Sequence, residues 1–213
     1  QESEQDFDGL WEDMDLKSSK LGKMVSEKSK LIAKILNTIN TIDFHLENME
    51  LDVLGDAYEY LIGMFAQTAG KKGGEFYTPV NMSKLVARLA TVGLTEAKSV
   101  SDCACGSGGL LLQVGKYCKV GKYFGQELTS TTYNLARMNM LLHGIDYKKF
   151  EILNVDTLEN HQNEDRQYTI QVANPPYSTS WSANPKFLDD DRFSAYGKLA
   201  PKSTADFAFV QHM

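Results

Sequence analysis

The stretch Asp102-Cys-Ala-Cys-Gly-Ser-Gly-Gly109 decides the fold of this 213-residue chain. It joins a short strand pattern at residues 99–102 to a helical pattern that begins at about Leu110. Glycines at a strand-to-helix turn let the backbone approach a bound ligand closely. The stretch therefore predicts the first strand, the first helix and a ligand-binding turn of an α/β domain.

After this turn, strand and helix patterns alternate along the chain. Strands are predicted at residues 123–127, 150–154 and 168–173, and a helix at residues 129–142. A β-α-β-α-β series of this kind forms a parallel sheet covered by helices. Residues 178–202 have no clean period and predict a long loop, and long loops in compact domains are often functional.

A further helix is predicted before the first strand. Thr78 is a candidate N-cap, Pro79 is suited to the first helical turn, and Gly93 is a candidate helix end. The predicted α/β domain therefore starts before residue 99.

The N-terminal part has a different pattern. Apolar residues recur at three- and four-residue steps in residues 21–39 and again in residues 51–65, which predicts two helices, each with one buried face. Glycines at residues 70–74 then interrupt the pattern. We predict a small all-α domain at residues 1–70 and the α/β domain at residues 71–213.

The composition is that of a globular protein. Hydrophobic residues make up 42% and charged residues 23%, and no apolar stretch is long enough to span a membrane. The acidic N-terminus lacks the pattern of a signal peptide, so we expect a cytoplasmic protein whose three cysteines are reduced.

The net charge of −6 is unevenly distributed. Residues 1–70 carry 14 acidic and 6 basic side chains, whereas residues 71–213 carry 14 and 16. The composition of the second part neither reveals nor excludes a nucleic-acid partner.

Several common sites are excluded at the glycine-rich turn. Leu111 stands where a dinucleotide fingerprint has its third glycine, and no Gly-Lys-Ser/Thr sequence forms a phosphate-binding loop. Cys105 occupies the first glycine position of a nucleophile elbow, so Ser107 is not predicted as a nucleophile. Because no cysteine or histidine pair has zinc spacing, no metal site is predicted.

Acidic residues end the next two predicted strands. Glu127 closes one strand and Asp156 follows another, so both are expected in the crevice that contains Asp102. In open parallel sheets the ligand lies at the carboxyl ends of the strands, where an acid about 20 residues after the glycine turn binds ribose hydroxyls. The three acids predict a site for a nucleoside ligand.

A second motif, Asn174-Pro-Pro-Tyr177, follows the last predicted strand. The prolines fix φ and remove N–H donors, which sets the direction of the carbonyl groups. The Asn174 side-chain oxygen and the Pro175 carbonyl can each accept one hydrogen of an exocyclic amine, which favours attack of its lone pair on a methyl group. Tyr177 would stack on a base that has been flipped out of a duplex.

Together these motifs resemble those of S-adenosylmethionine-dependent N6-adenine DNA methyltransferases, and most closely the modification subunit of type I restriction-modification systems. Leu54–Ile62 resembles the family's helix before the catalytic domain, and Gly74–Pro79 resembles its first cofactor motif. The resemblance implies a Rossmann-like methyltransferase domain. It implies a catalytic motif formed by Asn174, Pro175, Pro176 and Tyr177. It implies cofactor contacts by Phe76, Tyr77, Thr78, Pro79, Asp102, Ala104, Gly106, Ser107, Gly108, Gly109, Glu127 and Asp156.

The resemblance also implies partners: double-stranded DNA, a specificity subunit, a second modification subunit and a restriction subunit, with no membrane. The family's sheet has seven strands, of which four are identifiable here. We therefore expect a fragment that lacks the C-terminal strands.

Three alternatives remain. The Asn-Pro-Pro-Tyr motif also suits methylation of a protein glutamine amide, or of cytosine N4. A catalytically inactive assembly or DNA-clamping subunit is a third. A C5-cytosine mechanism is excluded, because it needs a cysteine directly after proline and the chain has none.

Overall fold

The structure is a computed structural model that describes residues 8–10, 15–42, 51–68, 76–160 and 166–213. The predicted glycine-rich break at residues 70–74 lies outside the described residues. None of the helices in these ranges is long and apolar enough to cross a membrane.

The centre of the fold is a sheet of four parallel strands in the order β3-β2-β1-β4. The strands are β1 (Glu96–Asp102), β2 (Lys119–Glu127), β3 (Phe150–Asn154) and β4 (Ile170–Gln171). The predicted parallel sheet is thus confirmed. The last strand is shorter than predicted, because its pairing with β1 ends shortly before two prolines that lack N–H donors.

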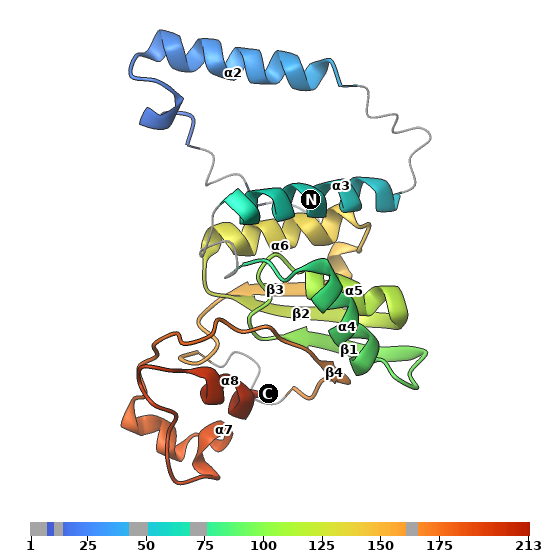
Figure 1. The fold of residues 1–213 in the computed structure, drawn as a ribbon, viewed down its shortest axis with the longest axis vertical. Helices are drawn as coiled ribbons and strands as arrows, with labels where there is room; N and C mark the ends of the chain where they lie inside the picture. Colours follow the sequence, from blue (N-terminus) through green and yellow to red (C-terminus); the bar gives the residue numbers. More distant parts are fainter. Residues whose placement is uncertain (1–7, 11–14, 43–50, 69–75, 161–165) are drawn as a thin grey trace.

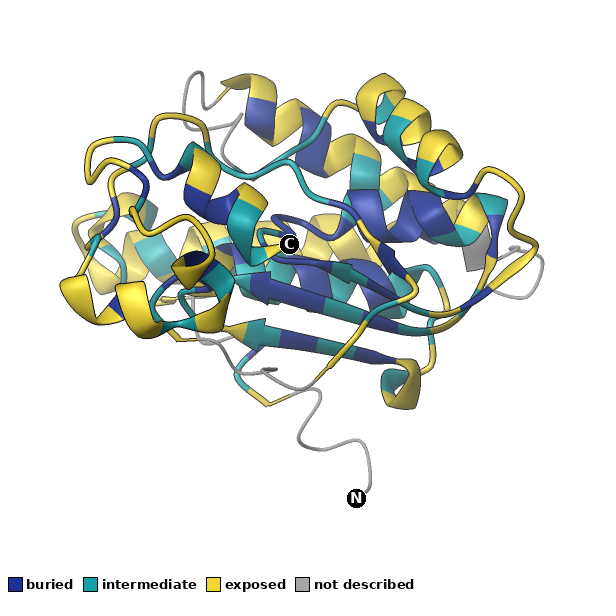
Figure 2. Ribbon diagram, turned by 90° about the horizontal axis from the view of Figure 1, so that it is seen from below, coloured by how far each residue is buried: buried dark blue, intermediate teal, exposed yellow. Residues whose placement is uncertain are grey.

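Helices α5 (Gly109–Tyr117) and α6 (Ser130–Leu142) pack on this sheet, and α4 (Val80–Ala90) packs on α5. Helix α5 contacts β1 and β2, α6 contacts β2 and β3, and a short helix η3 (Tyr147–Lys149) leads into β3. Figure 2 shows that buried residues gather in the strands and in parts of the adjacent helices. The three cysteines are buried free thiols, as expected.

The expected cap of α4 is wrong. Thr78 does not cap the helix; Pro79 is the N-cap residue, and its carbonyl accepts hydrogen bonds from the N–H groups of Met82 (2.9 Å) and Ser83 (3.0 Å). The Thr78 side chain is therefore available for another partner.

The N-terminal helices differ in how they pack. After the short helix η1 (Ser19–Leu21), α2 (Val25–Asn40) stands apart from the rest of the molecule (Figure 1). It buries none of its residues, so the predicted buried face is wrong within the described part of the chain. Helix α3 (Leu51–Thr68) instead packs on α6 and buries Ile62 and Ala66.

The segment predicted as a long loop is largely packed. It contains η4 (Pro185–Asp189) and α7 (Asp191–Ser194), and α8 (Asp206–His212) follows it. Three aromatic side chains hold it together, with ring centroids 5.5–5.7 Å apart: Trp181, Phe187 and Phe193. This cluster forms a second core beside the sheet.

We expect Phe193→Ala to destabilise this second core. Phe193 is 0% exposed, so its truncation should lower the free energy of unfolding by about 3–5 kcal/mol. The matched control is Leu188→Ala on the same segment, where the side chain is 42% exposed and the effect should stay within about 0.5 kcal/mol. Urea denaturation of both variants checks this, and equal effects would contradict the packing described.

Candidate functional site

The glycine-rich turn connects β1 to α5 in a conformation that needs glycine. Gly106 has φ +55° and Gly108 has φ +80°, values that residues with a side chain rarely adopt. A Cβ atom on Gly106 would lie 2.6 Å from the carbonyl oxygen of Phe76. The same oxygen accepts a hydrogen bond from the Ser107 N–H at 3.0 Å. The turn and the segment at residues 76–79 therefore lie in direct contact.

Glu127, at the end of β2, faces this turn. Its Oε2 atom accepts a hydrogen bond from the Gly106 N–H at 3.1 Å, and its Oε1 atom accepts one from the Thr129 N–H at 2.8 Å. Burial raises the pKa of Glu127, and these N–H donors lower it in part.

Asp102 supports the turn from within. The side chain is 2% exposed, and its Oδ1 atom accepts a hydrogen bond from the Ala104 N–H at 2.9 Å. Burial, opposed by the Ala104 N–H and assisted by the nearby Glu127 carboxylate, raises the pKa of Asp102 to about 7. Asp102 thus shapes the turn, and it does not line the cavity that contains Glu127.

Asp156 follows β3 and caps a turn with its carboxylate. Its Oδ1 atom accepts hydrogen bonds from the N–H groups of Leu158 (3.0 Å) and Glu159 (3.2 Å). The residue directly after Asp156 is the buried Thr157, and its hydroxyl donates a hydrogen bond to the carbonyl of Cys103 at 2.6 Å. This bond ties the loop after β3 to the glycine-rich turn after β1.

Asn174 follows β4 and is connected to the segment before α4. Its Nδ2 atom donates a hydrogen bond to the Thr78 hydroxyl oxygen at 3.2 Å. In this orientation the Oδ1 atom stays available to accept a hydrogen bond. Tyr177, three residues later, is 75% exposed. An exposed aromatic ring beside an amide acceptor suits the binding of a planar base.

These strand ends line one cavity of about 690 Å³, a volume typical of ligand sites. Of the predicted site residues, the cavity is lined by Ala104, Glu127, Asp156, Asn174, Pro175, Pro176 and Tyr177. The other predicted site residues do not line it: Phe76, Tyr77, Thr78, Pro79, Asp102, Gly106, Ser107, Gly108 and Gly109. Tyr77 points away, since its hydroxyl lies 3.1 Å from where a Cβ on Gly63 of α3 would be.

Sequence reasoning missed part of the cavity wall. The added residues include Leu128 and Thr129 directly after Glu127, and Trp181 and Phe209 from the C-terminal segment. Leu128 has a local sequence signal, because an apolar residue directly after a strand-end acid is suited to pack on a base. Trp181 and Phe209 have none, because contacts distant in sequence bring them there.

The cavity combines strand-end carboxylates with an asparagine-proline motif. Comparison with known proteins shows which family has this sequence. Residues 49–213 match the family described as N-6 DNA Methylase. The chain belongs to the N-6 DNA methylase family. It is 44% identical, over 99% of its length, to the methylase subunit of the type I restriction enzyme MpnII from Mycoplasma pneumoniae. It is 36% identical, over 76% of its length, to that of HindI from Haemophilus influenzae.

A solved structure agrees closely with this N-6 DNA methylase chain. The methyltransferase subunit of the type I restriction-modification system from Streptococcus thermophilus matches it with a TM-score of 0.89 and 44% identity over 99% of the chain. A class I S-adenosylmethionine-dependent methyltransferase from Listeria monocytogenes shares the fold, with a TM-score of 0.64 and 18% identity. The predicted Rossmann-like methyltransferase fold is thus confirmed. The chain covers 42% of the MpnII subunit and 46% of the S. thermophilus chain, less than half of each.

We expect Gly106→Ala to abolish tight binding of S-adenosylmethionine. The positive φ of Gly106 is strained for alanine. In addition, the new Cβ would lie 2.6 Å from the Phe76 carbonyl oxygen, a backbone atom that can move only if the chain itself shifts. Gly93→Ala is the matched control, because Gly93 also has a positive φ (+76°) but nothing lies within 4 Å of its Cβ position. Calorimetric titration with S-adenosylmethionine should separate the two variants, and similar affinities would contradict the contact.

We expect Asp102→Asn to change how stability depends on pH. Burial raises the pKa of Asp102 from 3.8 to about 7, so between these values the folded protein holds a proton that the unfolded chain has released. This contribution to the free energy of unfolding is complete below pH 3.8 and is lost as the pH rises to about 7. The wild type should therefore lose stability relative to Asp102→Asn between about pH 4 and pH 7 in urea denaturation. Parallel pH profiles would contradict this assignment.

Proposed function

We propose that this chain carries the donor-binding and catalytic part of an S-adenosylmethionine-dependent DNA methyltransferase that acts on adenine N6. The observation that carries the proposal is that Glu127, Asp156 and Asn174 line the same cavity, although they come from three different strand ends. A carboxylate suited to ribose and an amide suited to an amine thus share one site.

The donor half of the cavity fits S-adenosylmethionine, which supplies an activated methyl group when bound. Gly106 leaves room that a Cβ would fill, and the Glu127 carboxylate beside it is a strand-end acid suited to ribose hydroxyls. Asp156 accepts from the adenine end of the ligand. Leu128, 67% exposed beside this carboxylate, offers an apolar surface for the base.

The acceptor half of the cavity belongs to the Asn174–Tyr177 motif. The Asn174 Oδ1 atom and the Pro175 carbonyl each accept one hydrogen of the adenine N6 amine, which frees its lone pair for attack on the methyl group. Tyr177 stacks on the base. Because a paired base cannot reach the cavity, the target adenine must be flipped out of the duplex.

The proposed setting is a type I restriction-modification system. The relatives described above are methylase or methyltransferase subunits of such systems. We extend to this chain the same partners: double-stranded DNA, a specificity subunit that chooses the target, a second modification subunit and a restriction subunit. In this arrangement residues 1–70 are an N-terminal helical domain, and residues 71–213 are the N-terminal part of the catalytic domain.

Labelled-methyl transfer tests the proposed reaction. The full-length protein, assembled with its specificity subunit, is given labelled S-adenosylmethionine, unmethylated DNA and protein, and the products are digested to nucleosides and amino acids. Label in N6-methyladenine is the expected result. Label in N4-methylcytosine or methylglutamine would move the activity to another acceptor. Tight donor binding without transfer would favour an inactive assembly subunit.

The hydrogen bond from Asn174 to Thr78 makes a separate prediction. Thr78→Val removes the acceptor for the Asn174 Nδ2 atom while keeping the side-chain shape, so the amide loses its fixed orientation. We expect kcat to fall roughly tenfold to a hundredfold with the affinity for S-adenosylmethionine nearly unchanged. Thr78→Ser keeps the hydroxyl and should restore most of kcat. A Thr78→Val enzyme with normal kcat would contradict the orienting role.

A further inference from the structure

The rear of the glycine-rich turn, away from the cavity, is held by a buried amide. Asn139 on α6 is 0% exposed, and its Nδ2 atom donates a hydrogen bond to the Ser107 carbonyl at 2.9 Å. On the other side of the same residue, the Ser107 N–H donates to the Phe76 carbonyl. Both peptide groups of Ser107 are thus held, and the turn has little freedom to shift.

Glu59 reaches this point from α3, a helix that does not belong to the sheet domain predicted from the sequence. Its carboxylate lies close enough to the Asn139 side chain for that amide to lower the pKa of Glu59. Its Oε1 atom also lies 3.0 Å from where a Cβ on Gly109 would be, at the first residue of α5. A carboxylate beside the first turn of a helix is favourable, because unpaired N–H groups concentrate positive charge there.

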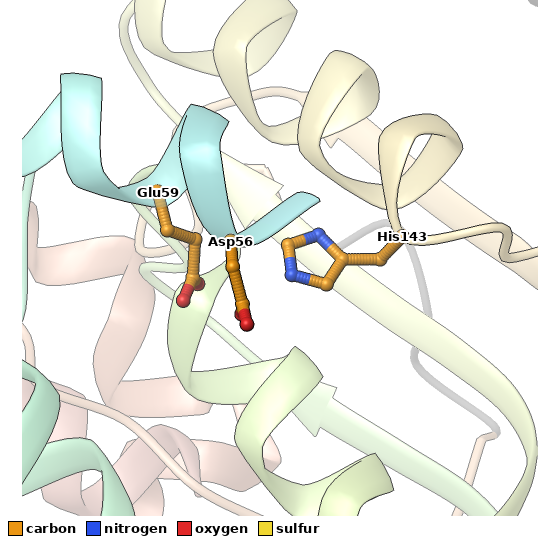
Figure 3. A group of neighbouring side chains, drawn as sticks. All are labelled: Asp56, Glu59 and His143. Atoms are coloured by element: carbon orange, nitrogen blue, oxygen red, sulfur yellow. The ribbon is translucent and has the colours of Figure 1, made fainter. Parts of the chain in front are cut away.

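The pKa of Glu59 is raised overall, because burial and the Asp56 carboxylate outweigh the groups that favour its ionised form. Burial raises the pKa of Glu59, whereas His143, Lys116 and the Asn139 amide lower it. Figure 3 shows Glu59 and Asp56 on α3 beside His143 at the end of α6. The His143 ring packs on Gly55, where a Cβ would come within 2.6 Å of it, so α3 lies very close to α6.

Glu59 and Asp56 differ in their contacts although both lie on α3. The Asp56 side chain is 61% exposed and pairs with Lys116 at 3.1 Å. Glu59 instead lies beside Gly109, at the end of the turn, and near Asn139, the residue that holds Ser107. Of these two carboxylates, Glu59 is therefore the one that lies at the glycine-rich turn.

We propose that Glu59 is a positioning residue for the cofactor turn: it orients the Asn139 amide, which holds the Ser107 carbonyl. This makes α3, from the N-terminal helical part, a structural component of the donor site. The inference rests on the proposed binding of S-adenosylmethionine at that turn. It goes further by assigning a role to a residue about 50 positions before the turn, outside the cavity.

The test compares Glu59→Gln with Asp56→Asn, two carboxylate-to-amide changes on the same helix, in the full-length protein. We expect Glu59→Gln to raise Kd and KM for S-adenosylmethionine about tenfold with kcat nearly unchanged, and Asp56→Asn to leave both near wild type. Thermal denaturation confirms that each variant is folded at the assay temperature. Wild-type protein that binds no S-adenosylmethionine would refute the proposed function itself, whereas equal Kd for wild type and Glu59→Gln would refute only the positioning role.

A double substitution separates positioning from general destabilisation. Because Glu59 acts through Asn139, adding Glu59→Gln to Asn139→Ala should raise Kd no further, and a full additional tenfold effect would contradict the proposal. If Asn139→Ala does not fold, the single-variant comparison still decides the outcome.

The three side chains in Figure 3 have ligand atoms within 4.8 Å of one another, so the test includes Mn²⁺. Mn²⁺-dependent binding of S-adenosylmethionine that is lost in both Glu59→Gln and His143→Gln would overturn the hydrogen-bonded role in favour of a cation site. Affinity that does not depend on Mn²⁺ supports the positioning role.

Discussion

The close contact between the glycine-rich turn and the Phe76 carbonyl is the constraint on which the rest of the site depends. With Gly106 in a left-handed conformation, the backbone reaches Phe76, and the Gly106 N–H is then directed at Glu127. A side chain at this position would separate the turn from the segment before α4. That segment also contains Thr78, which orients Asn174, so the turn links the donor side of the cavity to the acceptor side.

The parallel sheet explains why residues so distant in sequence share one cavity. Each strand ends at the same edge, and each is followed by a chemically distinct residue: the glycine turn after β1, Glu127 at the end of β2, Asp156 after β3 and Asn174 after β4. The order β3-β2-β1-β4 puts the turn between Glu127 and Asn174. A methyl donor bound at the turn is thereby next to the amine acceptor.

Local patterns predicted much of this fold and site. The strands from 99–102 to 150–154 and the helix at 129–142 were predictable because periodicity and glycine are local, and strand-end positions followed from parallel topology. The aromatic packing of Trp181, Phe187 and Phe193 was not, since it depends on contacts with no sequence period. The prediction for helix α2 was wrong for a different reason. Its amphipathic pattern correctly indicates a helix with one apolar face, but such a pattern does not determine whether another element covers that face, and here the apolar side chains are exposed.

The central claim is that one cavity holds the methyl donor at the glycine-rich turn beside Asn174. A crystal structure of the full-length protein with S-adenosylhomocysteine tests it most directly. The account predicts that the ribose hydroxyls contact Glu127, that the adenine lies near Asp156 and Leu128, and that the sulfur faces Asn174. A ligand bound elsewhere, or a sulfur directed away from Asn174, would contradict it.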